Sequence, residues 1–165
     1  MIVVADTSPL NYLIRMGRPE ILRNLFGRVL IPSAVLTELQ HSGAPSAVRS
    51  WAESPPSWLE VISCISLDES LPEALDVGER WAISLAVQLR ADLLLVDEKS
   101  ARSQAIERGI RVAGTLAVLL QAALQNELAL PEILGELRAL GFYMSASVEQ
   151  GLLEEFERLR EDPRD

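Results

Sequence analysis

Two aspartates follow two of the most apolar stretches of the chain. Asp6 comes directly after IVVA at 2–5, and Asp97 comes directly after LLLV at 93–96. If both stretches are parallel strands, the two carboxylates emerge at the same edge of the sheet, where sites form in open α/β sheets. Aspartate is also a favourable N-cap of a following helix. The matching positions favour metal ligands, and the capping interpretation stays open for each residue.

Two glutamates are candidates to join them. Glu79 lies early in a predicted helix, on the same face as Ala82 and Ile83, and an acid on that core-facing side needs a cation or a donor. Asp76 and Glu79 also have the D-x-x-E spacing of a capping box, and the two interpretations weigh equally. Glu38, within SAVLTELQ, is an ordinary solvated helical acid unless the other acids lie near it.

Carboxylates that folding brings together repel one another, so such a cluster is stable only around cations. Oxygen ligands without His or Cys favour Mg²⁺ or Mn²⁺. A metal held this way can generate a hydroxide nucleophile for a phosphodiester or a phosphate ester. Thr7 and Ser8 supply hydroxyls that can orient a carboxylate or a metal-bound water, although Ser8 equally fits a helix cap.

Composition excludes several other kinds of site. The single cysteine, Cys64, excludes an internal disulfide, and with one histidine, His41, the chain lacks the ligands of most zinc sites. A net charge of −9 argues against a protein that coats nucleic acid non-specifically. No apolar run approaches the roughly 20 residues that span a bilayer, and no basic region begins a signal peptide. We therefore expect a cytoplasmic protein.

Short apolar stretches alternate with helical patterns along the chain. Strands are predicted at 2–5, 28–31, 59–65, 93–96 and 110–114, and helices at 8–16, 19–26, 33–43, 44–54, 76–91, 98–109, 115–126, 131–140 and about 147–160. This alternation predicts an α/β fold with a parallel sheet covered by helices on both faces. We expect one domain over residues 1–165, with a helical C-terminal extension from about residue 115.

Four segments, in this order, resemble the acidic motifs of PIN-domain proteins: VVADTSPL, IPSAVLTEL, DVGERWAISLA and LLLVDEKSAR. The continuation from Gly114 to Ser145 resembles one PIN-like branch related to the VapC-type toxin nucleases. The resemblance implies a three-layer α/β/α sandwich with a mainly parallel sheet. It also implies Mg²⁺- or Mn²⁺-dependent cleavage of RNA, commonly single-stranded, which leaves 3′-hydroxyl and 5′-phosphate ends.

By this resemblance four acids are catalytic and hold the metal: Asp6, Glu38, Glu79 and Asp97. Asp6 and Asp97 are expected to be the principal ligands, and the two glutamates to bind directly or through waters. Glu98 can replace or assist Asp97, with a lower rank because successive side chains diverge. Arg102 resembles a recurrent basic position that can contact a phosphate, and its alternative is a surface ion pair.

The sequence thus predicts a metal-dependent endoribonuclease. The resemblance further implies the toxin of a toxin–antitoxin pair, with an antitoxin partner and a homodimer. The acidic charge and an aromatic content of 5% instead favour a catalytically silent PIN-like binding module. A phosphatase that uses Asp6 as nucleophile ranks lowest, because Ser8 stands where a second acid is expected and Lys99 is the single lysine.

Overall fold

A computed structural model describes residues 1–63 and 65–162 of the chain. Within them, one sheet of five parallel strands has the order β3-β2-β1-β4-β5. The strands are β1 (Val3–Ala5), β2 (Val29–Pro32), β3 (Leu59–Ile62), β4 (Leu93–Leu95) and β5 (Val112–Ala113). The strand order reverses between β1 and β4, which makes a topological switch point at the carboxyl ends of these two strands. This is the edge at which Asp6 and Asp97 were expected.

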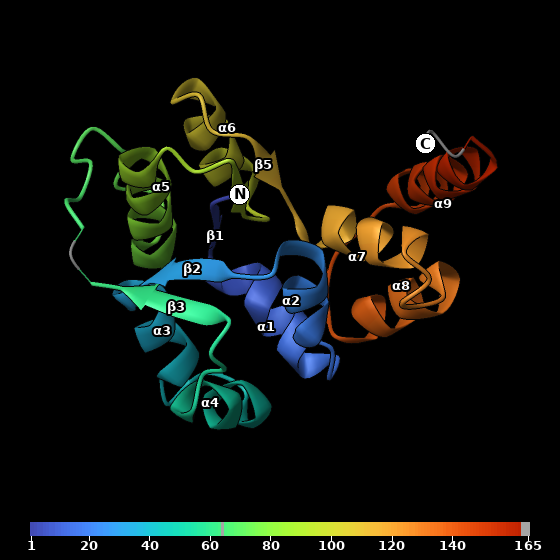
Figure 1. Cartoon of the computed structure of the whole chain (residues 1–165), viewed down its shortest axis with the longest axis horizontal. Coiled ribbons are helices and arrows are strands. Elements are labelled where there is room, and N and C mark those ends of the chain that lie inside the picture. The colour runs from blue at the N-terminus through green and yellow to red at the C-terminus, as the bar shows by residue number, and fades with distance from the viewer. Residues whose placement is uncertain (64, 163–165) are drawn as a thin grey trace. The chain divides into compact units, whose positions relative to one another are not determined.

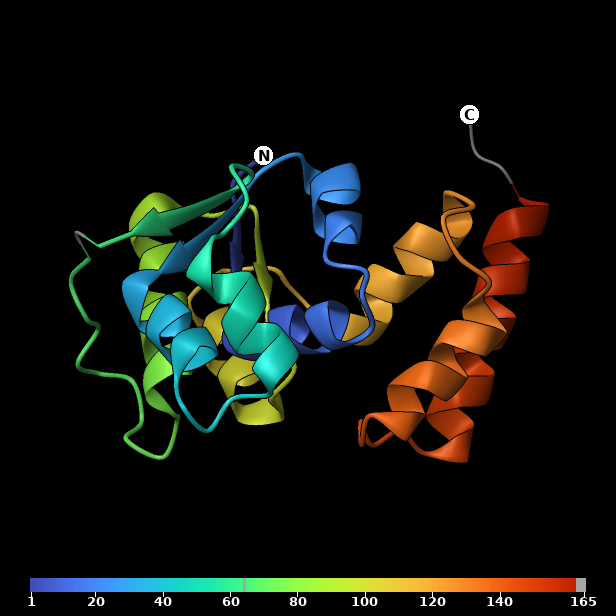
Figure 2. The same ribbon diagram turned by 90° about the horizontal axis from the view of Figure 1, so that it is seen from below.

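Helices cover both faces of this sheet. Those of the part with the sheet are α1 (Thr7–Arg15), α2 (Glu20–Phe26), α3 (Ser33–Gln40), α4 (Ser46–Glu53), α5 (Val77–Leu89) and α6 (Lys99–Glu107). Figures 1 and 2 show α5 and α6 on one face and α1, α3 and α4 on the other. Right-handed crossover connections place these two groups of helices on opposite faces, because the chain crosses the sheet in one direction from β1 to β3 and in the other from β4 to β5. The predicted three-layer α/β/α sandwich is confirmed.

The core lies between the sheet and α5. Val4, Leu94 and Ile83 are completely buried, and α5 is buried along much of its length, as its apolar sequence predicts. The third strand is shorter than predicted and ends at Ile62, which pairs with Pro32, the last residue of β2. Because β2 ends there and α3 begins, β3 has no neighbour to pair with beyond Ile62. Cys64, within the predicted strand, lies outside the described residues.

The chain divides into two compact units, Met1–Thr115 and Leu116–Asp165. The first contains the sheet and α1–α6, and the second is helical, with α7 (Thr115–Leu124) beginning at the division, α8 (Leu130–Ala139) and α9 (Ala146–Glu161). In the second unit, α8 buries Ile133 and Leu134 and is joined to α9 by an ion pair between Arg138 and Glu149. Among the described residues, no helix is both long enough and apolar enough to cross a membrane.

Candidate metal centre

Asp6 follows β1 and is the backbone N-cap residue of α1, yet its side chain makes no capping hydrogen bond. Its backbone N–H donates to the Leu95 carbonyl at 2.9 Å, which fixes it beside the end of β4. The side chain is 4% exposed, and its Oδ1 has no hydrogen-bond partner among the described residues. A buried carboxylate oxygen without a partner is costly, so this atom calls for a proton or a cation.

Glu38 reaches from α3 to the first turn of α5. Its Oε1 accepts a hydrogen bond from the Gly78 backbone N–H at 2.8 Å, and its Oε2 accepts one from the Thr7 hydroxyl. The Thr7 hydroxyl therefore orients a carboxylate, as its position in the sequence suggested. Both oxygens of Glu38 are held by donors from other helices, although the side chain is only half-buried.

Asp76 and Glu79 form the capping box that was one of two interpretations of their spacing. Asp76 Oδ1 accepts from the Glu79 N–H at 2.7 Å, and Glu79 Oε2 accepts from the Asp76 N–H at 3.0 Å. Asp76 is exposed and Glu79 is buried. The capping box thus holds an exposed aspartate at the point where the chain enters α5.

Three carboxylates converge at the switch-point edge: Asp6, Glu38 and Asp76 each place one oxygen within 4.8 Å of the others. In residues 1–63 and 65–162 this is the group that could hold a metal ion. Sequence reasoning missed Asp76 because it interpreted this residue only as a cap. A carboxylate has two oxygens, and an N-cap aspartate uses only one of them to accept a hydrogen bond from the helix. The other oxygen is available for a cation.

Asp97 lies outside this group of three. Its Oδ1 accepts from the Thr115 N–H and its Oδ2 from the Thr115 hydroxyl, both at 2.7 Å, so it holds the first residue of α7. A Cβ on Gly114 would lie 2.7 Å from Asp97 Oδ1, so this glycine leaves room for the carboxylate. Glu79 is likewise not part of the three-carboxylate group.

The three auxiliary residues occupy different environments. Ser8 lies within α1 and does not cap it, since the helix begins at Thr7. Glu98 is exposed and is the backbone N-cap residue of α6, without a side-chain capping bond. The Arg102 side chain is half-buried beside Asp97, and among the described residues it has no hydrogen-bond or ion-pair partner.

A family model described as DUF3368: PIN domain matches residues 2–158. The chain belongs to the PIN domain family. PIN domains are in general metal-dependent nucleases, and the carboxylate cluster is compatible with that chemistry. The fold is similar to that of a PilT N-terminus domain protein from the hyperthermophilic archaeon Sulfolobus solfataricus P2. The TM-score is 0.55, with 20% identity over 74% of this chain and 93% of that chain. No curated protein matches the sequence.

Burial and mutual repulsion raise the pKa values of acids in this PIN domain. Burial raises the pKa of Asp6 well above its ordinary value, the Thr7 N–H partly offsets this, and the charges of Asp76, Glu79 and Glu38 raise it further. Burial also raises the pKa of Glu79 to about 7, against the lowering effect of the Asp76 N–H. Without a cation, therefore, burial favours the protonated forms of Asp6 and Glu79.

The metal-free PIN domain should lose stability as pH rises from about 4.5 to about 7. In that window the folded state binds more protons than the unfolded state, because the pKa of Glu79 is raised on folding. The expected loss is on the order of 1–3 kcal/mol, complete above the folded pKa. Urea unfolding in EDTA at pH 5 and pH 8 measures it. Mn²⁺ should reverse the trend, because it binds ionised carboxylates; equal midpoints at both pH values in EDTA would contradict the prediction.

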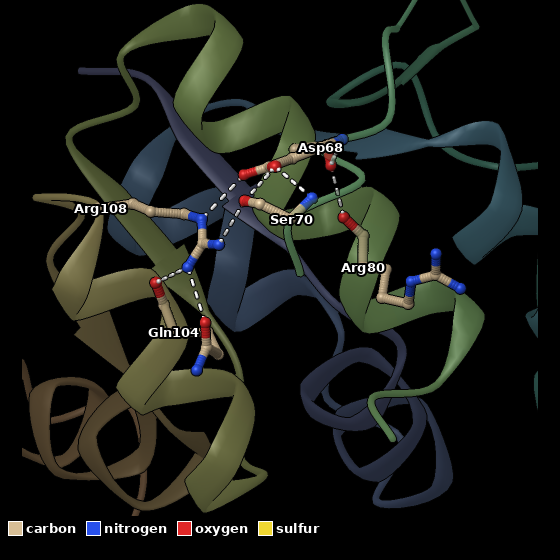
Figure 3. A network of polar contacts seen from close by, with 6 residues as sticks. Asp68, Ser70, Arg80, Gln104 and Arg108 are labelled. Carbon is tan, nitrogen blue, oxygen red and sulfur yellow. Dashed lines mark hydrogen bonds and ion pairs between the residues drawn. The ribbon is translucent and has the colours of Figure 1, made fainter. Parts of the chain in front are cut away.

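The loop before α5 ends at Asp76, which belongs to the three-carboxylate group. Arg108, directly after α6, anchors this loop (Figure 3). The Arg108 guanidinium donates to Asp68 Oδ2 at 2.8 Å, to the Ser70 hydroxyl at 3.0 Å, and to Gln104 Oε1 at 2.7 Å. The Ser70 hydroxyl and then Arg108 lower the pKa of Asp68 to about 2. Beyond this anchor, Leu71 and Leu75 are buried in the core, which fixes the course of the loop toward Asp76.

Arg108→Ala should lower the free energy of unfolding by about 1–3 kcal/mol, because it leaves the partly buried Asp68 carboxylate without its cation. Arg111→Ala, at an exposed residue of the following segment, is the matched control and should change stability little. Urea denaturation of both variants at pH 7 measures the difference. Equal stability of the two variants would show that Arg108 does not anchor the loop.

Proposed function

We propose that this chain is an Mg²⁺- or Mn²⁺-dependent endoribonuclease that hydrolyses phosphodiester bonds of single-stranded RNA. One observation carries the proposal. The buried Asp6 Oδ1 has no partner among the described residues, and Asp6 supplies one of three carboxylate oxygens that lie within 4.8 Å of one another. A set of oxygen ligands alone suits these two cations. When bound, such a cation supplies Lewis acidity and activates water for attack on phosphorus.

The residues of this chain have distinct parts in the proposed site. Asp6, Glu38 and Asp76 would hold the cation. The sequence-based proposal adds Asp97 as a principal ligand and Glu79 as a residue that completes the site, directly or through waters. Asp76 is exposed to solvent, so a long substrate would reach the site from this side. Arg102, whose charge acts on Asp97 but whose side chain makes no hydrogen bond or ion pair among the described residues, would bind a phosphate of the RNA backbone.

The test is a cleavage assay with protein stripped of metal by EDTA and dialysed. A labelled single-stranded RNA is incubated with MnCl₂, with MgCl₂ or with EDTA, beside single-stranded DNA and duplex RNA of the same sequence. Cleavage of the single-stranded RNA with metal alone, leaving 3′-hydroxyl and 5′-phosphate ends, is expected. A protein that binds Mn²⁺ but cleaves none of these substrates would contradict the nuclease assignment.

The second candidate is a catalytically silent binding module, which the net charge of −9 favours, since a nuclease gains affinity from a basic face. On this proposal the three acids bind no cation. Titration calorimetry with Mn²⁺ separates the two functions: heat with saturation at millimolar metal or below supports the nuclease, and its absence supports the module.

We also propose that the nuclease is the toxin of a toxin–antitoxin pair and forms a homodimer. Half-buried apolar residues along α9, Leu152, Phe156 and Leu159, offer surface for a partner. Growth arrest on expression, relieved by the product of an adjacent gene, is expected of a toxin, and light scattering measures the oligomeric state. Unimpaired growth and a monomeric mass would contradict both proposals.

A further inference from the structure

Gly78 stands at a position where the backbone itself does not require glycine. It is the second residue of α5, is buried, and its φ lies outside the left-handed region. A Cβ built on it would lie 2.5 Å from Glu38 Oε2, 2.6 Å from Oε1 and 2.7 Å from Cδ. The space that a side chain would take at this position is therefore occupied by the Glu38 carboxylate.

The same glycine also donates to that carboxylate. Its N–H, one of the free donors in the first turn of α5, is 2.8 Å from Glu38 Oε1, and the Thr7 hydroxyl donates to Oε2. The positive end of the α5 dipole favours the ionised carboxylate there. Glu38 has a long and flexible side chain that loses rotamer freedom when it is ordered. Two donors from two other helices therefore hold it in one orientation.

We propose that Gly78, together with Thr7, is a positioning residue that fixes the Glu38 carboxylate beside Asp6 and Asp76 before a cation arrives. This inference rests on the proposed metal site. A methyl group at residue 78 would displace the carboxylate, which is the movable end of its side chain, and not the backbone of α5. The displaced carboxylate would lose both donors and its place within 4.8 Å of the other two oxygens.

The first experiment compares Mn²⁺ affinity by titration calorimetry in Gly78→Ala and Gly135→Ala. Gly135 lies inside α8, and a Cβ on it meets nothing within 4 Å, so it is the matched control. Gly78→Ala should bind Mn²⁺ about 10- to 100-fold more weakly than the wild type, as for the loss of a group that orients a ligand. Thr7→Val, which removes one donor, should weaken binding to a smaller extent. Wild-type affinity in Gly78→Ala would overturn the inference.

The second experiment needs no metal and separates this inference from the proposed site. Urea midpoints are measured in EDTA for the wild type, Gly78→Ala, Glu38→Ala and the double variant. Alanine favours a helix over glycine, so Gly78→Ala should raise the midpoint in the Glu38→Ala background, where the carboxylate nearest to the new methyl group is absent. In the wild-type background the rise should be smaller or reversed. Equal shifts in both backgrounds overturn the inference, even if the wild type binds no Mn²⁺ and the metal site fails.

Discussion

Asp6→Asn is expected to abolish Mn²⁺-dependent cleavage of RNA, with a loss of more than about 100-fold, while the protein remains folded. Mutation of a residue that only orients a metal ligand typically lowers metal affinity or activity about 10- to 100-fold. Loss of a direct ligand should lower activity by more than that. Asparagine has the size and shape of aspartate but lacks its charge. It therefore leaves the buried space filled, removes the negative charge and replaces one of the two carboxylate oxygens by an NH2 group, which cannot bind a cation.

The same substitution should stabilise the metal-free protein at pH 8, because burial, and after it the charges of Asp76, Glu79 and Glu38, raise the pKa of Asp6 and so make its ionised form unfavourable in the folded state. Glu107→Gln, at an exposed residue near the end of α6, removes one negative charge far from these contacts and serves as the control. Circular dichroism shows whether the variant is folded, urea midpoints in EDTA measure its stability, and a gel assay with labelled RNA measures cleavage. Undiminished cleavage by pure Asp6→Asn protein would reject the assignment of Asp6 as a ligand.

Much of the fold was predictable because the elements carry their own signals. The last three residues of IVVA form β1 and are fully buried, and LLLV forms β4 and the residue after it, so continuous apolar runs indicated central parallel strands. The end of β3 was not predictable, since it depends on where β2 stops at Pro32. The strand order is likewise set by packing between distant segments, which the pattern of one segment does not contain.

The candidate site was predictable only in part, for a related reason. Asp6 stood out because it ends a strand, whereas the meeting of Glu38 with the first turn of α5 joins residues 40 positions apart in the sequence. Asp76 was recognised in one function, as a cap, which does not reveal that it also faces Asp6 and Glu38. Its neighbour Glu79, matched by the family resemblance, is engaged with the Asp76 N–H. The structure therefore raises the question of which acid of the D-x-G-E segment binds the cation.

Asp76→Asn and Glu79→Gln should answer this question with opposite results. Asparagine is as good an N-cap as aspartate, so Asp76→Asn keeps the bond to the Glu79 N–H and the stability of α5. It removes a charge from the three-carboxylate group, and we expect Mn²⁺ affinity to fall by more than about tenfold.

In Glu79→Gln, the amide oxygen still accepts from the Asp76 N–H, so the capping box survives. This change removes a buried acid whose pKa burial raises to about 7, so it should stabilise the metal-free protein above that pH. Mn²⁺ affinity should change by less than about threefold, since Glu79 is not in the group that meets at 4.8 Å. Calorimetry with Mn²⁺ on both variants at pH 7.5 is the measurement. If Glu79→Gln lost Mn²⁺ binding and Asp76→Asn kept it, Glu79 would be the third ligand, as the family resemblance implies, and Asp76 only a cap.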